Sequence, residues 1–309
     1  MELAIKILVR AILYPAIAYL IVSLIFFYLY VKPSRYVSPY NPDAFGLEYE
    51  EISFKTSDNI EISAWFLPAK KPPSNPPLTG GKSPLHPPFT KGERGGFKKA
   101  VIICHGYPMD KGNLLETASF LAKEYNVLLF DFRAMGKSKG AISTGGWKET
   151  RDFLAAVDFL KKRGFKDIGA FGFSLGGAVV LMANSPDIKA IVVDSSYENL
   201  NSVLDSIFSG FGIFGKPIVW LMKFWGRLFF NLNTGRVSPA DSIADIKKPV
   251  LLIHCEKDSQ IPVSAAKALH SKKPGSELWI IPEADHGQGH MLTGMQYEKK
   301  VLEFFRKNL

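Results

Sequence analysis

Short apolar runs alternate with longer segments of helical spacing along most of this 309-residue chain, and this alternation limits the folds it can adopt. Six of the runs have the length and character of buried parallel strands; they are Ala100–Cys104, Val127–Asp131, Ile168–Phe173, Ile188–Asp194, Pro249–His254 and Glu277–Ile281. Five segments carry apolar residues at helical spacing; they are Asn113–Glu124, Gly146–Arg163, Leu175–Asn184, Val263–His270 and Met295–Lys307. The pattern predicts an α/β fold with one parallel sheet covered on both faces.

Two further strands precede the first of these runs. Glu48–Lys55 and Ile60–Leu67 alternate apolar and polar residues on either side of Asp58–Asn59. Alternation of this kind around a short turn predicts a β-hairpin. The sheet is therefore expected to be mostly parallel, with eight strands in all.

An apolar segment near the N-terminus has the length of a membrane span. Residues 11–31 (AILYPAIAYLIVSLIFFYLYV) hold 21 positions without a charge, and about 20 apolar residues cross a bilayer. A cleaved signal peptide usually has a shorter apolar region with small residues behind it, whereas VKPSRY follows here. We therefore expect residues 1–35 to be a retained anchor and residues 36–309 to be the catalytic domain. Lys6 and Arg10 balance Lys32 and Arg35, so flanking charge favours neither orientation.

The formal charge of +9 lies outside the alternating body. Residues 1–35 carry a net charge of +3 and residues 70–99 a net charge of +6, which leaves about zero for the rest. No basic surface for nucleic acid is therefore expected. The excess charge instead favours contact with an anionic membrane surface.

Two segments interrupt the strand–helix alternation. Residues 70–99 contain seven prolines and five glycines, a composition that predicts a disordered surface insertion. Residues 195–237 are rich in Phe, Trp and Leu, which fits either a cap over a hydrophobic pocket or a surface lying on the bilayer. Four charged residues argue against a second membrane span there; they are Asp205, Lys216, Lys223 and Arg227.

The sequence Gly172-Phe173-Ser174-Leu175-Gly176 joins a predicted strand to a predicted helix. This is the context of a nucleophile elbow, in which a serine on a sharp turn projects from the end of the sheet. The flanking glycines avoid collisions in the turn, and the helix N-terminus offers amides to a developing oxyanion. Ser174 is therefore the candidate nucleophile.

A serine nucleophile needs a base, and the base needs an orienting carboxylate. Asp258 follows the next-to-last strand and is the candidate acid, with Glu256 as its competitor. His286 lies five residues after the last strand and is the candidate base, with His290 as the alternative. The pair His286-x-x-x-His290 also suggests a metal site, but no carboxylate or cysteine completes it and Gly-Gln-Gly disfavours a helix between the two.

The oxyanion hole requires two backbone donors. The amide of Leu175 is one candidate, and the amide of Tyr107, after the strand that ends at Cys104, is the other. We expect the His105 side chain to fix this loop by hydrogen bonds, and Asp131 and Arg133 to brace neighbouring loops. Neither a dinucleotide fingerprint nor a Walker motif is present, so no cofactor is expected.

Several of these segments together resemble the α/β-hydrolase superfamily, most closely its membrane-anchored Bem46-like and dipeptidyl-peptidase-like serine hydrolases. They are HGYPMDKGN, DFRAMGKSKG, GFSLGG, LIHCEKDSQIPV and ADHG with a later YEKKVLEFF. The resemblance covers about residues 45–309 except 70–99. It implies a triad of Ser174, Asp258 and His286, with Tyr107 and Leu175 as oxyanion donors. The chain departs from relatives at Ala134, where they commonly have glycine, and in its unusually apolar cap.

Serine at the nucleophile position favours esters, thioesters or amides, and the anchor and apolar cap favour a lipid-like ester with an apolar acyl group. The expected partners are such a substrate and membrane lipid. A serine peptidase of the dipeptidyl-peptidase-like type is the alternative enzyme, and a catalytically idle, membrane-tethered binding protein is the alternative outside catalysis. In the strand order of this superfamily, two strands separate Cys104 from Cys255, so both are expected to be free thiols.

Overall fold

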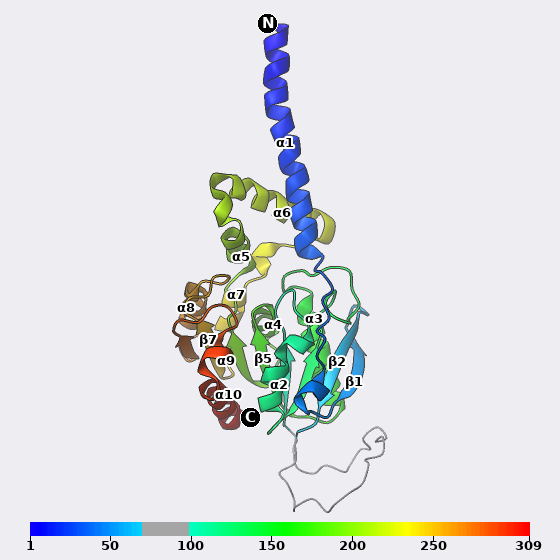
Figure 1. Ribbon diagram of the computed structural model, residues 1–309, viewed down its shortest axis with the longest axis vertical. Coiled ribbons are helices and arrows are strands. Elements are labelled where there is room, and N and C mark those ends of the chain that lie inside the picture. The colour runs from blue at the N-terminus through cyan, green and yellow to red at the C-terminus, as the bar shows by residue number, and fades with distance from the viewer. Residues whose placement is uncertain (70–98) are drawn as a thin grey trace, which may run out of the picture.

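The computed structural model describes residues 1–69 and 99–309 (Figure 1). The predicted insertion, residues 70–99, lies outside the described residues except for Lys99. That residue is the first of a strand, so the predicted insertion extends one residue too far.

One eight-stranded sheet forms the centre of the molecule, in the order β1-β2-β4-β3-β5-β6-β7-β8. β1 pairs antiparallel with β2, β2 pairs antiparallel with β4, and every other neighbouring pair is parallel. This confirms the predicted hairpin and the mostly parallel sheet. The strands are β1 (Glu50–Lys55), β2 (Glu61–Leu67), β3 (Lys99–Cys104), β4 (Asn126–Phe130), β5 (Asp167–Phe173), β6 (Ile188–Asp194), β7 (Val250–Cys255) and β8 (Glu277–Ile281).

Helices cover both faces of the sheet, as the alternation predicts (Figure 1). The apolar core on one face includes side chains of α3 (Glu149–Lys162), α4 (Leu175–Ala183), α7 (Pro239–Ala244) and α8 (Val263–Lys272). The core on the other face includes side chains of α2 (Leu115–Leu121) and α10 (Met295–Asn308). The 3₁₀ turns η1 (Pro42–Phe45) and η2 (Lys111–Leu114) and the short helix α9 (Gly289–Thr293) complete the body.

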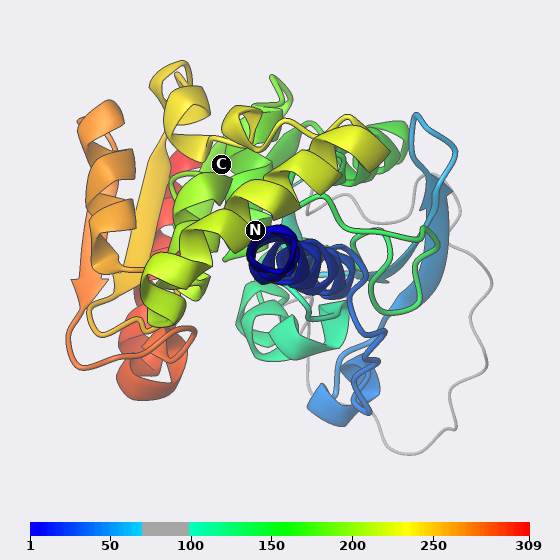
Figure 2. The ribbon, with the colours of Figure 1, turned by 90° about the horizontal axis from the view of Figure 1, so that it is seen from above.

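The N-terminal helix α1 (Glu2–Val31) extends away from the body and meets the segment after β6 (Figure 1). It is the one described helix that by itself has the length and composition of a membrane span, a property that signal sequences share. The segment after β6 contains α5 (Leu200–Ile207), η3 (Ser209–Phe214), α6 (Gly215–Phe230) and η4 (Thr234–Arg236). Seen from above, with α1 viewed end-on, α6 passes beside α1 and across the body (Figure 2). A third apolar cluster joins α1 to α5 and α6.

Cys104 ends β3 and Cys255 ends β7, with β5 and β6 between them. This is the strand order that the superfamily resemblance predicts, and both cysteines are buried free thiols.

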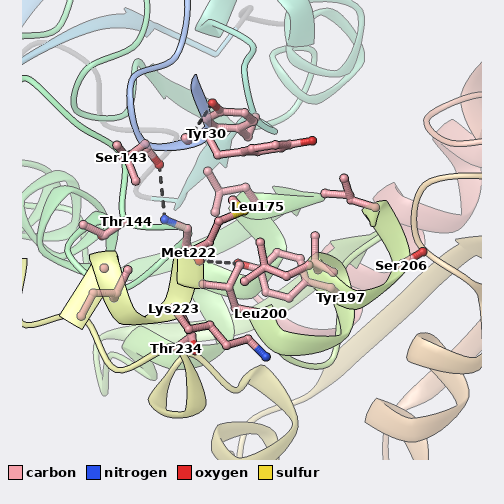
Figure 3. A pocket seen from close by; sticks show the side chains of 18 of the residues that line it. Tyr30, Ser143, Thr144, Leu175, Tyr197, Leu200, Ser206, Met222, Lys223 and Thr234 are labelled. Carbon is pink, nitrogen blue, oxygen red and sulfur yellow. Dashed lines mark hydrogen bonds between the residues drawn. The ribbon is translucent and has the colours of Figure 1, made fainter. Parts of the chain in front are cut away.

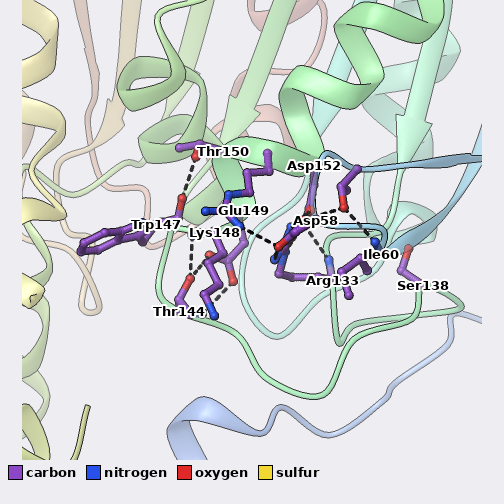
Figure 4. Close-up of polar contacts among 12 residues, drawn as sticks. Asp58, Ile60, Arg133, Ser138, Thr144, Trp147, Lys148, Glu149, Thr150 and Asp152 are labelled. Atoms are coloured by element: carbon purple, nitrogen blue, oxygen red, sulfur yellow. Dashed lines mark hydrogen bonds and ion pairs between the residues drawn. The ribbon is translucent and has the colours of Figure 1, made fainter. Parts of the chain in front are cut away.

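Arg133 braces the loop after β4, as the sequence predicts (Figure 4). Its buried guanidinium contacts Asp152 of α3 at 2.6 Å and Asp58 of the hairpin turn at 2.8 Å. The hydrogen bonds from Arg133 lower the pKa of Asp58 well below its usual range. In the same loop Ala134 adopts a left-handed backbone with φ of 63°.

Candidate active site

Ser174 occupies the turn between β5 and α4 with φ of 52° and ψ of −114°. The strained left-handed value is typical of a functional turn held by its surroundings. A Cβ at Gly176 would lie 2.2 Å from the Cys104 carbonyl oxygen, and one at Gly172 would lie 2.6 Å from the Gly176 backbone. Only glycine fits at both positions, so the structure has the strand–turn–helix arrangement that the sequence predicts.

Asp258 and His286 come together at the carboxyl edge of the sheet. The buried Asp258 side chain accepts hydrogen bonds from the amides of Gln260 and Ile261 at 2.9 and 2.7 Å through Oδ1. Its Oδ2 lies 2.7 Å from Nδ1 of His286. An ionised carboxylate can only accept hydrogen bonds, so Nδ1 of His286 must be the donor and carries the imidazole proton. Nε2 of His286 is therefore left with a free lone pair.

The competing acid and base lie elsewhere. Glu256 is exposed to solvent. His290 lies in α9, where its ring nitrogens are 3.3 Å from Glu116 and 3.4 Å from Glu298. Two carboxylates therefore approach His290, one at each ring nitrogen. Among residues 1–69 and 99–309, no group of three or more His, Cys, Asp or Glu side chains is placed to hold a metal.

The loop after β3 is fixed by His105, as the sequence predicts. Nε2 of His105 accepts a hydrogen bond from the amide of Phe132 at 2.9 Å, so Nδ1 carries the proton and donates to the Gly106 carbonyl at 2.6 Å. Burial lowers the pKa of His105 and favours this neutral form. Tyr107 follows directly, and its hydroxyl donates to the Tyr30 carbonyl of α1 at 2.9 Å. Burial raises the pKa of Tyr107 to about 12.

A cavity of about 440 Å³ reaches Ser174 (Figure 3). Tyr107 and Leu175 contribute to its lining, together with a mainly apolar set of side chains from α5 and α6. Phe27, Tyr30 and Val31 of α1 form part of its wall. The sequence predicts a cap over the pocket but gives no sign that the N-terminal helix also encloses it.

Two buried residues beneath the Ser174 turn are missed by sequence reasoning. The Ser174 amide donates to the carbonyl of Asp194, at the end of β6, at 2.8 Å. The Asp194 carboxylate accepts a hydrogen bond of 2.5 Å from the Tyr297 hydroxyl of α10. Burial raises the pKa of Asp194. In the sequence, Asp194 is an ordinary strand residue and Tyr297 an ordinary residue of an apolar helix face, so the pattern does not indicate that they support the Ser174 turn.

A family model described as the alpha/beta hydrolase fold matches residues 99–213. The protein YqkD of Bacillus subtilis is 31% identical over 215 residues, which is 66% of this chain and 70% of YqkD. Protein bem46 of Schizosaccharomyces pombe is 26% identical over 266 residues, with 80% and 76% of the two chains covered. The solved structure of the Pyrococcus furiosus esterase Pf2001 has a TM-score of 0.70 and 27% identity, with 90% of this chain and 98% of that chain covered.

Proposed function

Because the chain belongs to the α/β-hydrolase superfamily, as one of its Bem46-like members, we propose that it is a membrane-anchored serine hydrolase. Its substrates are carboxylic esters or thioesters with apolar acyl groups. Residues 1–35 serve as the anchor, and residues 36–309 form one hydrolase domain with residues 195–237 as its cap.

The observation that carries the proposal is the 2.7 Å contact between Asp258 Oδ2 and His286 Nδ1, at the same sheet edge as the Ser174 turn. With the proton held at Nδ1, Nε2 of His286 accepts the Ser174 hydroxyl proton while Oγ attacks the substrate carbonyl. The amides of Tyr107 and Leu175 stabilise the oxyanion. His286 then donates its proton to the leaving alcohol or thiol, and a water activated in the same way releases the acid.

The preference for apolar acyl groups follows from the cavity walls. The exposed surface of the cavity wall is mainly apolar, and α1, α5 and α6 supply many of its apolar side chains, while Lys223 is the charged residue of the lining. Each methylene that leaves water for such a cavity contributes about 0.8 kcal/mol. Charged or very short acyl groups gain little of this stabilisation, so they are expected to be poor substrates.

Retention of the anchor is supported by the contacts of the last turn of α1 with the body. The Tyr30 carbonyl accepts a hydrogen bond from the Tyr107 hydroxyl, and the Val31 carbonyl accepts one from the Ser143 amide at 2.7 Å. The Arg35 guanidinium donates to the Ser138 carbonyl at 2.7 Å. Cleavage as a signal peptide would remove these contacts together with part of the cavity wall.

Labelling by a fluorophosphonate probe tests the nucleophile in the full-length chain. The wild type should be labelled and Ser174→Ala should not. His286→Ala is expected to lower kcat/KM for p-nitrophenyl esters by about two to four orders of magnitude, while the control His290→Ala stays near wild type. Equal labelling of wild type and Ser174→Ala, or a large loss with His290→Ala alone, would overturn the assignment.

A further inference from the structure

The cap presents a large apolar face that no described residue covers. Side chains of η3 and α6 point outward, and Trp220 is 67% exposed. The other exposed apolar side chains of η3 and α6 are Phe211, Ile213, Phe214, Phe224, Leu228 and Phe229, of which Phe229 lies on the side of α6 next to Phe27 of α1. Soluble monomers rarely expose a large contiguous apolar patch, and such a patch usually indicates a surface that binds another protein, a membrane or a ligand.

The position of α1 indicates what covers this face. Trp225 of α6 donates to Ser23 of α1 at 3.0 Å, and Phe230 stacks on Phe27 at 5.8 Å. α6 therefore crosses α1 at about Ser23 to Phe27, and it runs crosswise to α1 (Figure 1). A membrane crossed by α1 would lie parallel to α6.

The length of the charge-free segment sets the depth of α6. Between Arg10 and Ser23 there are 12 residues, or roughly 18 Å of helix. A bilayer's hydrocarbon core is about 30 Å thick. If α6 lay outside the membrane, Lys6 and Arg10 would have to enter the hydrocarbon, where charged side chains are strongly disfavoured. If residues 11–31 span the core, α6 lies within its apolar boundary.

The composition of the cap agrees with that depth. Taken together, α5 and the η3–α6 segment are long and apolar enough to cross a membrane, but a bend of 93° separates them. Lys216 and Arg227 are exposed on α6 beside the aromatic residues. They lie on the same side of the helix as Trp220, and their long side chains can reach the lipid headgroups while the helix itself lies at the apolar boundary.

We propose that the exposed face of η3 and α6 is embedded in the bilayer beside α1, so that membrane-resident esters reach Ser174 directly from the lipid. The same two helices line the cavity, through Phe27 and Val31 of α1 and Met222 and Gly226 of α6. An acyl chain entering between them does not cross bulk water. The route to Ser174 rests on the proposed hydrolase function, whereas the depth of the cap does not.

Depth-dependent quenching tests the embedding without any need for activity. The full-length Ser174→Ala protein is placed in vesicles of phosphatidylcholine and phosphatidylglycerol that contain phosphatidylcholine spin-labelled near the headgroup or in mid-chain. The fluorescence of Trp220 is obtained as the difference between this protein and the same protein with an added Trp220→Phe substitution. The fluorescence of Trp279, on β8, is obtained in the same way from Trp279→Phe. The spin labels should quench the Trp220 signal several-fold more strongly than the Trp279 signal. Equal, weak quenching of both would overturn the proposal.

A second measurement compares substrates. Trp220→Glu should lower the hydrolysis of a long-chain ester dissolved in vesicles at least tenfold and leave a water-soluble p-nitrophenyl butyrate within twofold. The matched control is Met295→Glu on α10, which is 85% exposed and should change neither rate. A wild type without esterase activity would refute the proposed function but not the depth. The proposal would also be overturned if the wild type formed a dimer that Trp220→Glu dissociates and if Trp220 were shielded from the lipid quenchers. The apolar face would then bind a second copy of the chain.

Discussion

Filling the cavity from α6 should shorten the acyl chain that the protein accepts. Gly226 lies inside α6, is buried, and lines the cavity. A Cβ added there would meet Phe27 at 3.6 Å and Leu232 at 3.7 Å, which are ordinary van der Waals contacts. Gly226→Ala is therefore tolerated, and it should stabilise the protein by up to about 1 kcal/mol because alanine is the better helix former.

Gly226→Leu adds three further carbons beyond that Cβ. If they displace about three methylenes of an acyl chain, at about 0.8 kcal/mol each, the loss is roughly 2.4 kcal/mol, or about 60-fold in kcat/KM. We expect at least tenfold, because a flexible chain bends partly aside. The acetyl ester, which does not reach α6, should stay within twofold.

The assay is a series of p-nitrophenyl esters of increasing acyl length, measured on full-length wild type, Gly226→Ala and Gly226→Leu in the same detergent. The Ala variant separates the effect of a better helix former from the effect of filling space. Identical length profiles for wild type and the Leu variant would refute the assignment of this cavity to the acyl group. Thermal unfolding of all three variants shows whether a change arises from misfolding instead.

Two further variants test the contacts around the site. Tyr107→Phe removes the hydroxyl that donates a hydrogen bond to the Tyr30 carbonyl and keeps the backbone amide proposed for the oxyanion hole. We expect kcat/KM to fall severalfold and the protease sensitivity of α1 to rise. Unchanged values of both would contradict the role of this hydrogen bond in docking α1. Asp58→Asn should cost about 1–2 kcal/mol of unfolding free energy at pH 7. Because Arg133 lowers the pKa of Asp58, this stability is fully present above the unfolded pKa of about 3.9 and is lost progressively as the pH falls from there through the lower pKa of the folded state. Denaturant unfolding should show a smaller stability difference between wild type and Asp58→Asn at pH 3 than at pH 7, and a constant difference would contradict the linkage.

The sheet could be predicted closely because buried parallel strands have a distinctive sequence pattern. Each predicted strand boundary falls within two residues of the observed one. The order of the candidate site residues follows from the same pattern, since Asp258 and His286 come soon after the last two strands. Helix boundaries are less exact where 3₁₀ turns intervene: the predicted helix Asn113–Glu124 appears as η2 followed by α2, which ends at Leu121.

Buried polar support is harder to predict, because it depends on side chains that meet only in three dimensions. Asp194 and Tyr297 are 103 positions apart in the sequence and share a hydrogen bond under the Ser174 turn. His254, inside β7, places Nε2 2.9 Å from the Ile261 carbonyl and so supports the loop that carries Asp258. A strand or helix pattern records that these residues are buried but not what they contact.

The wall that α1 contributes was hidden for a different reason. The residues of α1 that face the cap recur at helical spacing; they are Tyr19, Ser23, Phe26, Phe27, Tyr30 and Val31. In an ordinary amphipathic helix such a stripe stands out against polar neighbours, but here the neighbours are equally apolar because they would face lipid. The only contrast is Ser23, a buried hydroxyl that accepts from Trp225 and donates to the Leu20 carbonyl. In an otherwise apolar helix, a single buried polar residue is thus the local sign that one face packs against protein.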